Sequence, residues 1–445
     1  MTMLTAMPRY EAYKDSGIEW LGEVPSSWSV QRIKHETELL TGFPFSSSKY
    51  SESGIKLARG INVKEGRTDW GETVFWPEIT PDLKKYELQA GDILIGMDGS
   101  KVGKNVCQIE NKDLPLLLLQ RVARIRAKQQ LVSSFLYWCF LNRFFLDWIN
   151  KSKTDPMIPH IAPSDINDYV IAFPDISIQV KIANFLDEKT AKIDEAISIK
   201  QKQIELLKER KQIIIQQAVT QGLDPTVPMK DSGVEWIGKI PAHWKVNRIK
   251  NLGKIINGFA FPSDAFKEDG VRVIKISNIQ PMNIDWSESS FVDESWLKKC
   301  GQFCVYDGDL VFALTRPIIS TGIKVATVKT SEKILINQRN AVFRPLSTCS
   351  VDWLYYIILS NGFINEFESE IDITGQQPNI STISISNLSI PIPSLDIQLS
   401  ISAYLSKKCS EIDACMIKMN EQISILKEYK TTLINSAVTG KIKVV

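Results

Sequence analysis

The chain has 445 residues, and its 44% hydrophobic and 23% charged residues lie close to the averages of globular proteins, which excludes wholesale disorder. At roughly 150 residues per domain, this length indicates two to four domains. The 53 basic and 51 acidic residues leave a net charge of +2. This balance excludes a protein that binds nucleic acid through its overall charge, so any such contact must come from local patches.

The cysteines and histidines favour neither a metal site nor a disulfide framework. The seven cysteines include no C-x-x-C pair, and the three histidines are widely dispersed. The first eight residues lack the pattern of a secretion signal, and the most apolar stretch, 135–149, is short and interrupted by polar residues. We therefore expect a cytoplasmic protein that carries no metal and no cofactor of its own.

The strongest pattern is a duplication. Residues 13–34 read YKDSGIEWLGEVPSSWSVQRIK and residues 229–250 read MKDSGVEWIGKIPAHWKVNRIK, with 13 of the 22 positions identical. A period of 216–219 residues is far too long for a solenoid, so it indicates a duplicated domain with a core in each copy. We interpret Trp20 and Trp28, which recur in the second copy, as anchors to that core rather than as platforms for stacked bases.

Each copy mixes strands with helices, which predicts an α+β domain. Gly-Asp pairs at 91–92 and 308–309 indicate turns that open short buried strands. The predicted strands are Ile93–Gly96, Gln120–Arg126, Leu310–Ala313 and Gln338–Arg344, and the predicted helices are Phe135–Ile149 and Val351–Phe363.

A long heptad pattern follows each copy. Ser177 and Asp396 stand at equivalent positions and are interpreted as N-cap residues, and Gly222 and Gly440 follow the predicted helix ends. Apolar residues then recur at a and d spacing for about five heptads, which is typical of a coiled coil. The predicted seam consists of Leu186, Ile193, Ile197, Ile204, Leu207, Ile214, Leu405, Ile412, Met416, Met419, Ile423, Leu426 and Leu433.

Two matched seams in one chain make each helix the obvious partner of the other. We expect an antiparallel coiled coil that relates two homologous globular domains by a pseudo-two-fold axis; the alternative is that each helix packs on its own domain. Thr190, Lys200 and Lys211 interrupt the apolar seam and are candidates for fixing its register. The expected segments are a first domain at 1–176, a helix at 177–222, a second domain at 223–395 and a helix at 396–445.

This layout resembles the specificity subunit of type I restriction–modification systems. The likeness rests on K-D-S-G-[IV]-E-W-[LI]-G-x-[IV]-P-x-x-W at 14–28 and 230–244, and on a heptad helix after each copy. It also includes Ile-Pro-His-Ile at 158–161 and Gln-Pro-Asn-Ile at 377–380. The likeness covers nearly the whole chain.

The resemblance implies a non-catalytic subunit that reads a bipartite, asymmetric target in double-stranded DNA. Each globular copy would be a target recognition domain, and the coil would be a spacer. Two methyltransferase subunits and motor-nuclease subunits would be the partners. The same likeness places S-adenosylmethionine, ATP and magnesium in those partners rather than in this chain.

The assembly that the resemblance implies is an enzyme, so catalytic motifs in this chain are the first alternative to a purely recognising role. A Gly-rich cofactor loop and an Asn-Pro-Pro-aromatic motif, which an adenine methyltransferase would need, are both missing from the sequence. Residues 96–104 superficially resemble a P-loop, but their glycine spacing is wrong and Asn105 stands where Ser or Thr would hold magnesium. An enzyme with an unrecognised site and a coiled-coil scaffold that binds no DNA remain the alternatives.

Local basic patches supply the candidate DNA contacts. Between residues 101 and 128 the chain carries seven basic and two acidic residues. Arg124 and Arg126 share one face of the predicted strand, where they either contact DNA or guard a strand edge against aggregation. Arg121 and Arg339 are instead interpreted as partly buried arginines paired to carboxylates, with DNA contact as the alternative. The predicted DNA-binding residues are Lys101, Lys104, Arg124, Arg126, Arg316, Lys324 and Arg344.

The duplication also helps to distinguish residues that build the scaffold from residues that determine sequence specificity. If the two copies read different sequences, residues that are identical in both cannot explain the difference, so shared residues such as Asp92 and Asp309 should serve the scaffold or position phosphates. Base readers should lie where the copies diverge around a common frame. The candidate windows are 46–51 against 262–267, 64–68 against 280–284, and 97–104 against 314–324.

Overall fold

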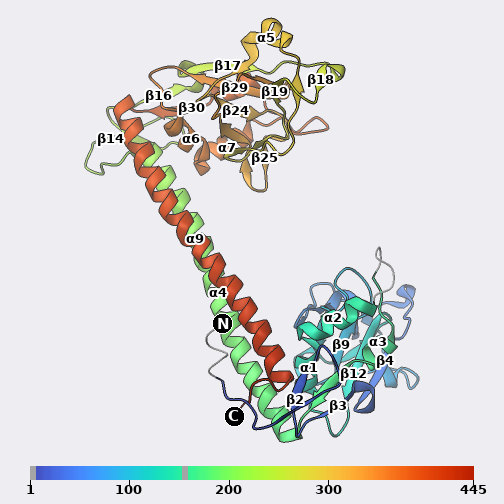
Figure 1. Cartoon of the computed structure of the whole chain (residues 1–445). Helices are drawn as coiled ribbons and strands as arrows, with labels where there is room; N and C mark the ends of the chain where they lie inside the picture. The colour runs from blue at the N-terminus through green and yellow to red at the C-terminus, as the bar shows by residue number, and fades with distance from the viewer. Residues whose placement is uncertain (1–6, 153–158, 445) are drawn as a thin grey trace. The chain divides into compact units, whose positions relative to one another are not determined.

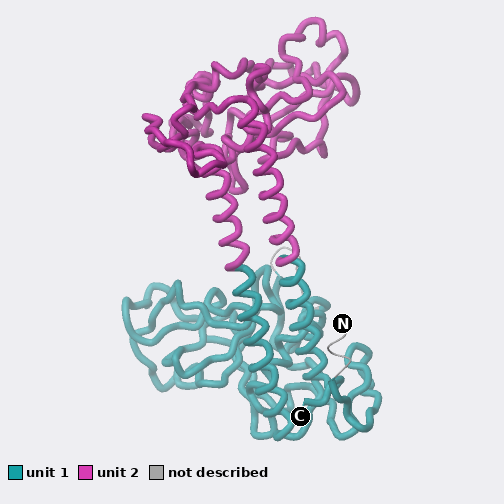
Figure 2. The backbone as a smooth tube through the Cα atoms, turned by 90° about the vertical axis from the view of Figure 1, so that its left-hand side faces the viewer, with its two compact units in different colours: residues 1–201, 420–445 teal, residues 202–419 magenta. Residues whose placement is uncertain are grey.

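The structure is a computed structural model that describes residues 7–152 and 159–444. The chain forms two compact units, coloured separately in Figure 2. Unit 1 comprises residues 1–201 and 420–445, and unit 2 comprises residues 202–419. Each unit therefore holds one copy of the repeated domain and a part of both long helices, so the compact units cut across the four sequence segments expected above.

Among the described residues of unit 1, the globular part contains an antiparallel four-stranded sheet in the order β10-β9-β12-β4 and a three-stranded sheet in the order β11-β5-β8. The strands β3 and β13, β1 and β2, and β6 and β7 pair separately. Figure 1 shows β4, β9 and β12 together with α1, α2 and α3. The elements are β1 (Tyr13–Asp15), β2 (Glu23–Pro25), β3 (Ser29–Arg32), β4 (Thr37–Thr41), β5 (Ile55–Ala58), β6 (Val63–Lys64), β7 (Arg67–Thr68), β8 (Phe75–Trp76), β9 (Ile93–Gly96), β10 (Val106–Gln108), β11 (Leu116–Leu118), β12 (Val122–Ala127), α1 (Ser133–Phe140), α2 (Arg143–Ser152), α3 (Pro163–Asn167) and β13 (Val170–Phe173).

Unit 2 repeats this plan. Its described residues contain a four-stranded sheet in the order β17-β29-β24-β27, which matches β4-β12-β9-β10 of unit 1, and a five-stranded sheet in the order β18-β22-β19-β28-β23. The elements are β14 (Met229–Asp231), β15 (Lys239–Pro241), β16 (Lys245–Arg248), β17 (Gly253–Asn257), β18 (Phe266–Lys267), β19 (Val271–Ile274), β20 (Ile279–Gln280), β21 (Asn283–Ile284), β22 (Phe291–Val292), α5 (Ser295–Cys300), β23 (Cys304–Val305), β24 (Leu310–Ala313), β25 (Ile318–Ile319), β26 (Gly322–Ile323), β27 (Val325–Thr327), β28 (Ile334–Ile336), β29 (Asn340–Pro345), α6 (Val351–Leu359), α7 (Asn361–Ser369), α8 (Thr382–Asn387) and β30 (Ser389–Ile392).

The predicted Gly-Asp turns are confirmed. Gly91 and Gly308 adopt φ angles of 92° and 82°, in the left-handed region that only glycine enters without strain. The strands β9 and β24 that follow them are buried along their whole length. The α+β prediction is therefore confirmed, and these turns start the central strands of both four-stranded sheets.

The prediction of one helix at Phe135–Ile149 was wrong, because two helices occupy this stretch. Asn142 lies between α1 and α2, is 4% exposed, and accepts a hydrogen bond from the Phe145 N–H at 2.8 Å. A buried amide that binds the backbone in this way competes with a continuous helix. In unit 2 the buried Ser360 lies between α6 and α7, which together replace the predicted helix Val351–Phe363, and its hydroxyl donates to the Ile357 carbonyl at 2.7 Å.

The two long helices are α4 (Ile176–Gln221, 46 residues) and α9 (Leu395–Val438, 44 residues). They begin before Ser177 and Asp396, so these residues lie in the first turn, and the N-cap interpretation was wrong. The glycines that follow the helix ends are confirmed as terminators, because Gly222 and Gly440 adopt φ angles of 78° and 72°.

Parts of both helices pair within each unit (Figure 2). In unit 1, Lys200 Nζ donates to Gln422 Oε1 at 2.6 Å, and Lys430 Nζ donates to Asp194 at 2.8 and 2.6 Å. These contacts run in opposite directions along the two helices, so the pairing is antiparallel. All thirteen apolar residues of the predicted seam are buried or half-buried. The alternative, in which each helix packs only on its own domain, was wrong.

Each globular domain is covered by the start of one long helix and the end of the other. The core of unit 2 includes Ala218 and Val219 from the end of α4 and Ile401 and Leu405 from the start of α9. In unit 1 the equivalent residues of α4 and α9, which are Ile182, Leu186, Ala437 and Val438, are buried as well. The anchoring role of the tryptophans is confirmed, because Trp28 is 1% exposed and Trp20 stacks on Tyr169 with ring centroids 5.5 Å apart.

Candidate nucleic-acid interface

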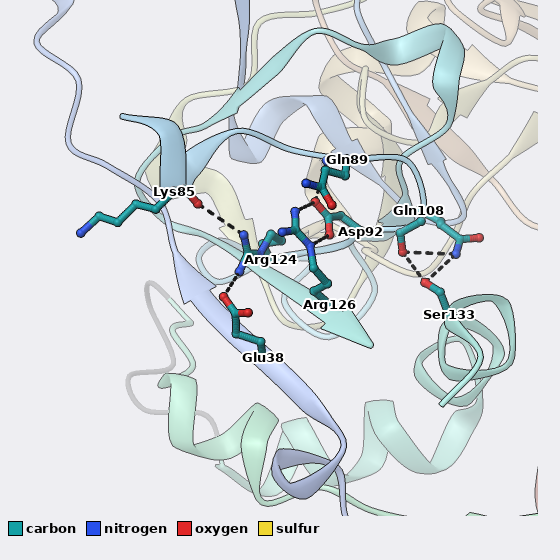
Figure 3. Close-up of polar contacts among 9 residues, drawn as sticks. Glu38, Lys85, Gln89, Asp92, Gln108, Arg124, Arg126 and Ser133 are labelled. Carbon is teal, nitrogen blue, oxygen red and sulfur yellow. Dashed lines mark hydrogen bonds and ion pairs between the residues drawn. The ribbon is translucent and has the colours of Figure 1, made fainter. Parts of the chain in front are cut away.

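The carboxylate of Asp92 holds Arg126 in unit 1 (Figure 3). Asp92 is 1% exposed and accepts hydrogen bonds from Arg126 Nε at 2.6 Å and Nη2 at 2.7 Å. The same carboxylate accepts the Gln89 N–H at 2.8 Å, which fixes the turn before β9. The hydrogen bond to Asp92 raises the pKa of Arg126 further. A bidentate pair with a buried carboxylate gives this arginine a structural role.

Unit 2 repeats the pair with Asp309 and Arg344. Arg344 donates from Nε and Nη2 to the Asp309 carboxylate at 3.1 and 2.8 Å, and Nη2 also donates to the Cys304 carbonyl at 2.8 Å. The two pairs occupy equivalent positions and are chemically identical. Arg126 and Arg344 were both predicted to contact DNA, but the structure places them as parts of a shared scaffold, where they cannot account for a difference between the copies.

Arg124 is not at an exposed strand edge. Its strand β12 lies between β9 and β4, and the side chain is 2% exposed. Its guanidinium forms an ion pair with Glu38 and donates to the Lys85 carbonyl at 3.3 Å (Figure 3). Both interpretations of Arg124, a DNA contact and a guard of the strand edge, assumed an exposed side chain, and the burial of this residue contradicts them.

The remaining predicted contacts divide into buried and exposed residues. Lys324 is 9% exposed and donates to the Ile276 carbonyl at 2.6 Å, and burial lowers its pKa. Lys101 and Lys104 are exposed in the loop between β9 and β10. Arg316 is exposed directly after β24. The structure therefore leaves Lys101, Lys104 and Arg316 of the predicted set accessible to a polyanion.

Arg316 belongs to a set of backbone contacts that we call the loop frame, and Lys101 and Lys104 lie in the loop that leaves its counterpart in unit 1. In unit 1 it joins residues 97–99, 121 and 159–161. The Met97 N–H donates to the Arg121 carbonyl at 3.0 Å, the Ile161 N–H to the Met97 carbonyl at 3.1 Å, and the Gly99 N–H to the Pro159 carbonyl at 3.0 Å. Three chain segments that are far apart in sequence are thereby held together.

The loop frame of unit 2 joins residues 314–316, 339 and 378–380 in the same way. The Leu314 N–H donates to the Arg339 carbonyl at 2.9 Å, the Ile380 N–H to the Leu314 carbonyl at 2.8 Å, and the Arg316 N–H to the Pro378 carbonyl at 2.8 Å. All three hydrogen bonds have their counterpart in unit 1. The repeat therefore conserves the backbone geometry of this site bond by bond.

The side chains in the two frames differ. In unit 1 the Asp98 carboxylate accepts a hydrogen bond from His160 Nδ1. At the equivalent positions of unit 2, Thr315 Oγ1 donates to Asn379 Oδ1 at 2.6 Å. One backbone frame thus presents an acidic and imidazole pair in one unit and a hydroxyl and amide pair in the other.

Arg121 and Arg339 do not fit the interpretation as partly buried arginines. Arg121 pairs with Asp98, with Nε 3.2 Å from Oδ2, but its side chain is 70% exposed. Arg121 has a φ angle of 69°, so it stands in a turn before β12 and not on the strand face that the sequence pattern assigned to it. Arg339 is exposed as well. Both arginines contribute their backbone carbonyl to the loop frame and occupy equivalent positions in the two units.

His160 and Asn379 were missed as candidate site residues. They lie within the Ile-Pro-His-Ile and Gln-Pro-Asn-Ile segments, which stand out in sequence because the copies differ inside a common pattern. Their proximity to residues 98 and 315 depends on the fold, because more than 60 residues separate each pair in the chain. Ile158 lies outside the described residues.

The fold and the two loop frames define a class of protein: a duplicated α+β recognition module whose copies share one scaffold and present different polar side chains. Comparison with known proteins agrees with this class. The model of the type I restriction modification DNA specificity domain matches the chain twice, at residues 26–209 and 241–424. The chain belongs to this family. It is a specificity subunit, the non-catalytic DNA-recognition component of a type I restriction–modification system.

Individual relatives support the assignment. The chain is 27% identical over 437 residues to the type I restriction enzyme MjaVIII specificity subunit of Methanocaldococcus jannaschii, which covers 95% of this chain and 94% of the relative. It is 31% identical over 170 residues to the EcoAI specificity subunit of Escherichia coli, which covers 37% of this chain and 29% of the relative.

Solved structures share the fold. A chain from a structure that describes complex assembly and conformational transition of the type I restriction–modification system superposes with a TM-score of 0.73 at 15% identity, covering 93% of this chain and 98% of that one. The HsdS subunit from Thermoanaerobacter tengcongensis gives a TM-score of 0.55, also at 15% identity, over 94% of this chain and 98% of that one. Among the helices that the structure describes, none is long and apolar enough to cross a membrane.

Proposed function

We propose that the chain reads a bipartite, asymmetric target in double-stranded DNA, with one half-site bound by the loop frame of each unit. The observation that carries this proposal is the pair of loop frames, which agree in backbone and differ in side chains. The common backbone supports the same approach to DNA in both units, because position and orientation are set by the scaffold. The different side chains support two different half-site sequences.

Contacts to the phosphate backbone supply the part of the affinity that does not depend on sequence. In unit 1 we assign this role to Lys101 and Lys104, which are exposed in the loop that leaves the frame. Arg121 and Arg339 are exposed and shared, so they suit phosphate contacts in both units. Lysine and arginine at such positions fix the register of a protein on the duplex without selecting bases.

The paired helices provide the surface for the partner subunits. Apolar side chains stand exposed outside the seam: Leu206 of α4 in unit 2 and Ile425 of α9 in unit 1 occupy equivalent positions of the repeat and are 55% and 64% exposed. Exposed aliphatic residues on a long helix are a typical docking site for the apolar face of another helix. We assign these faces to helices of the methyltransferase subunits. S-adenosylmethionine, ATP and magnesium would then be bound by the methyltransferase and motor-nuclease partners.

Mapping of DNA methylation tests this function directly. The full chain is produced together with its methyltransferase subunits in a host without adenine methylation of its own, and methylated adenines are mapped across the genome. The expected result is a motif of two different short sequences separated by a fixed gap, with one modified adenine on each strand. A continuous or palindromic motif would contradict the proposal that the two units recognise two different half-sites independently.

The alternative function is a coiled-coil scaffold that binds proteins and no DNA. It is distinguished by the salt dependence of DNA binding by the purified complex, because each phosphate contact releases counterions and steepens the fall of affinity with salt. Binding that is insensitive to both salt and DNA sequence would favour the scaffold.

A further inference from the structure

One position of the loop frame differs between the units more than any of its neighbours. It is Gly99 in unit 1 and Arg316 in unit 2. Both residues donate their backbone N–H to the carbonyl of a proline, Pro159 or Pro378, at 3.0 and 2.8 Å. Both adopt the left-handed conformation, with φ angles of 96° and 47°. The backbone is therefore kept while a side chain is present in one unit and missing in the other.

The conformation of Arg316 is strained. Residues other than glycine, asparagine and aspartate rarely adopt a positive φ, and a strained residue persists only where the surrounding structure enforces it. Glycine would remove the strain, as Gly99 does at the equivalent position. Unit 2 nevertheless carries arginine at this position. We infer that the arginine side chain has a function that offsets the strain.

The Arg316 side chain is exposed and unengaged in the part of the chain that the structure describes. No hydrogen bond or ion pair joins its guanidinium to another described residue. Arg124, Arg126 and Arg344, in contrast, are each held by a carboxylate. The constrained backbone fixes the position from which the Arg316 side chain extends, and its guanidinium N–H donors are free to bind. Such a group is suited to two hydrogen bonds with a planar pair of acceptors.

Its neighbours differ between the units together with it. Asn379 follows the proline that binds the Arg316 N–H, and its amide accepts from Thr315 Oγ1 at 2.6 Å and donates to the Gln377 carbonyl at 2.8 Å. In unit 1 the corresponding residues are His160 and Asp98. Three positions from two distant segments thus change as a group inside an unchanged backbone, which is the pattern that specificity requires and a general phosphate contact does not.

We propose that Arg316 reads a guanine in the half-site bound by unit 2, by donating two hydrogen bonds to guanine O6 and N7 in the major groove. Unit 1 lacks this contact because it has Gly99. The inference rests on the proposed function, and it names position 99/316 as a specificity-determining position of the repeat. Arginine to guanine is the most common bidentate contact between a side chain and a base, and lysine at the same place would supply a charge without the fork.

The test compares Arg316→Gly and Arg316→Lys with the wild-type chain, each produced with its methyltransferase subunits, by mapping methylated adenines. Arg316→Gly introduces the residue that unit 1 carries at this position, so we expect the variant to fold and melt like the wild type. We expect a single guanine of one half-site to become tolerant in both variants, with discrimination at that base pair lowered about tenfold or more. The other half-site should be unchanged.

The matched control is Arg248→Lys, which changes an exposed arginine of unit 2 that lies outside the loop frame, on β16. It should leave the motif intact. An unchanged motif in Arg316→Gly and Arg316→Lys would overturn the assignment, and so would an equal loss of methylation at every target, which is the signature of a phosphate contact. Loss of all methylation by both variants with an unchanged melting temperature would overturn it as well, because a single base reader does not abolish recognition of the whole site. If the wild-type chain itself gives no split motif, the proposed function fails, and that result is distinguishable from these.

Discussion

Lys211 of α4 donates to both carboxylate oxygens of Asp413 of α9, at 2.8 and 2.7 Å, across the helix pair of unit 2. Unit 1 repeats this ion pair at the equivalent positions with the helices exchanged, because there the lysine is Lys430 of α9 and the carboxylate is Asp194 of α4. A charged side chain within an apolar seam favours the helix register in which an oppositely charged side chain lies opposite it. The two ion pairs therefore fix which residues of α4 and α9 face each other in each unit.

Removing the carboxylate of this ion pair should destabilise unit 2. The Lys211 side chain is 19% exposed, so Asp413→Ala leaves a largely buried ammonium group without its partner. We expect a loss of about 1–2 kcal/mol in the free energy of unfolding, less than for a fully buried pair because Asp413 is partly exposed. Urea denaturation followed by circular dichroism measures it. Glu411→Ala, which changes an exposed carboxylate on the same helix, is the control and should have little effect; equal effects of the two variants would contradict a role in the seam.

The Asp92–Arg126 pair should contribute to stability rather than to DNA selection. In Asp92→Ala the guanidinium loses its two hydrogen bonds and the Gln89 N–H loses its acceptor. We expect the free energy of unfolding to fall by about 2–4 kcal/mol, because one partner of a buried ion pair is removed. Asp309→Ala should have a similar effect in unit 2. A variant that melts like the wild type but changes the methylated motif would show that the pair reads DNA after all.

Sequence patterns were sufficient for the duplication, the Gly-Asp turns and the seam, because each depends on local rules of spacing. They failed at Arg124, because the alternation of side chains along a strand cannot tell an inner strand from an edge strand. They failed at Arg121 as well, because this residue itself adopts a left-handed conformation and therefore stands in the turn before the strand. The proximity of His160 to Asp98 depends on tertiary contacts, so the composition of the loop frame could not be read from either segment alone.

The exposed lysines of unit 1 should set the salt dependence of DNA binding. Replacing Lys101 and Lys104 together by alanine removes two phosphate contacts in the proposed arrangement. The slope of log affinity against log salt should become shallower by roughly two, while the methylated motif stays the same. Fluorescence anisotropy of the purified complex with a target duplex at several salt concentrations measures the slope. The control is Lys112→Ala, from the same basic stretch, whose lysine already pairs with Glu110 at 2.8 Å. A slope unchanged by the double substitution would remove both lysines from the interface.

Lys324 should make the free energy of unfolding depend on pH in the alkaline range. Burial lowers its pKa below the ordinary value of 10.5, so the unfolded chain binds this proton more tightly than the folded chain. Between the lowered pKa of the folded state and pH 10.5, the unfolded state holds more protons, and the stability contributed by this residue rises with pH. The wild-type chain should therefore gain stability relative to Lys324→Met as pH increases through this window. Denaturant unfolding of both proteins at pH 7 and at several pH values up to 10.5 measures the difference; a difference that is constant with pH would show that Lys324 is as well solvated as an exposed lysine.

The exposed apolar residues of the long helices should be needed for partner binding and dispensable for the fold. Leu206 and Ile425 lie outside the predicted seam and are more than half exposed, so Leu206→Lys and Ile425→Lys add charge without burying it. We expect both single variants to melt like the wild type, and the double variant to lose most of its co-purification with the methyltransferase subunits, because a lysine at the centre of a helix–helix contact must be desolvated without a partner. Ser424→Lys places the same charge on the exposed neighbour of Ile425 and should leave co-purification intact. If the double variant retains its partners as well as Ser424→Lys does, then the methyltransferase subunits dock elsewhere on the chain.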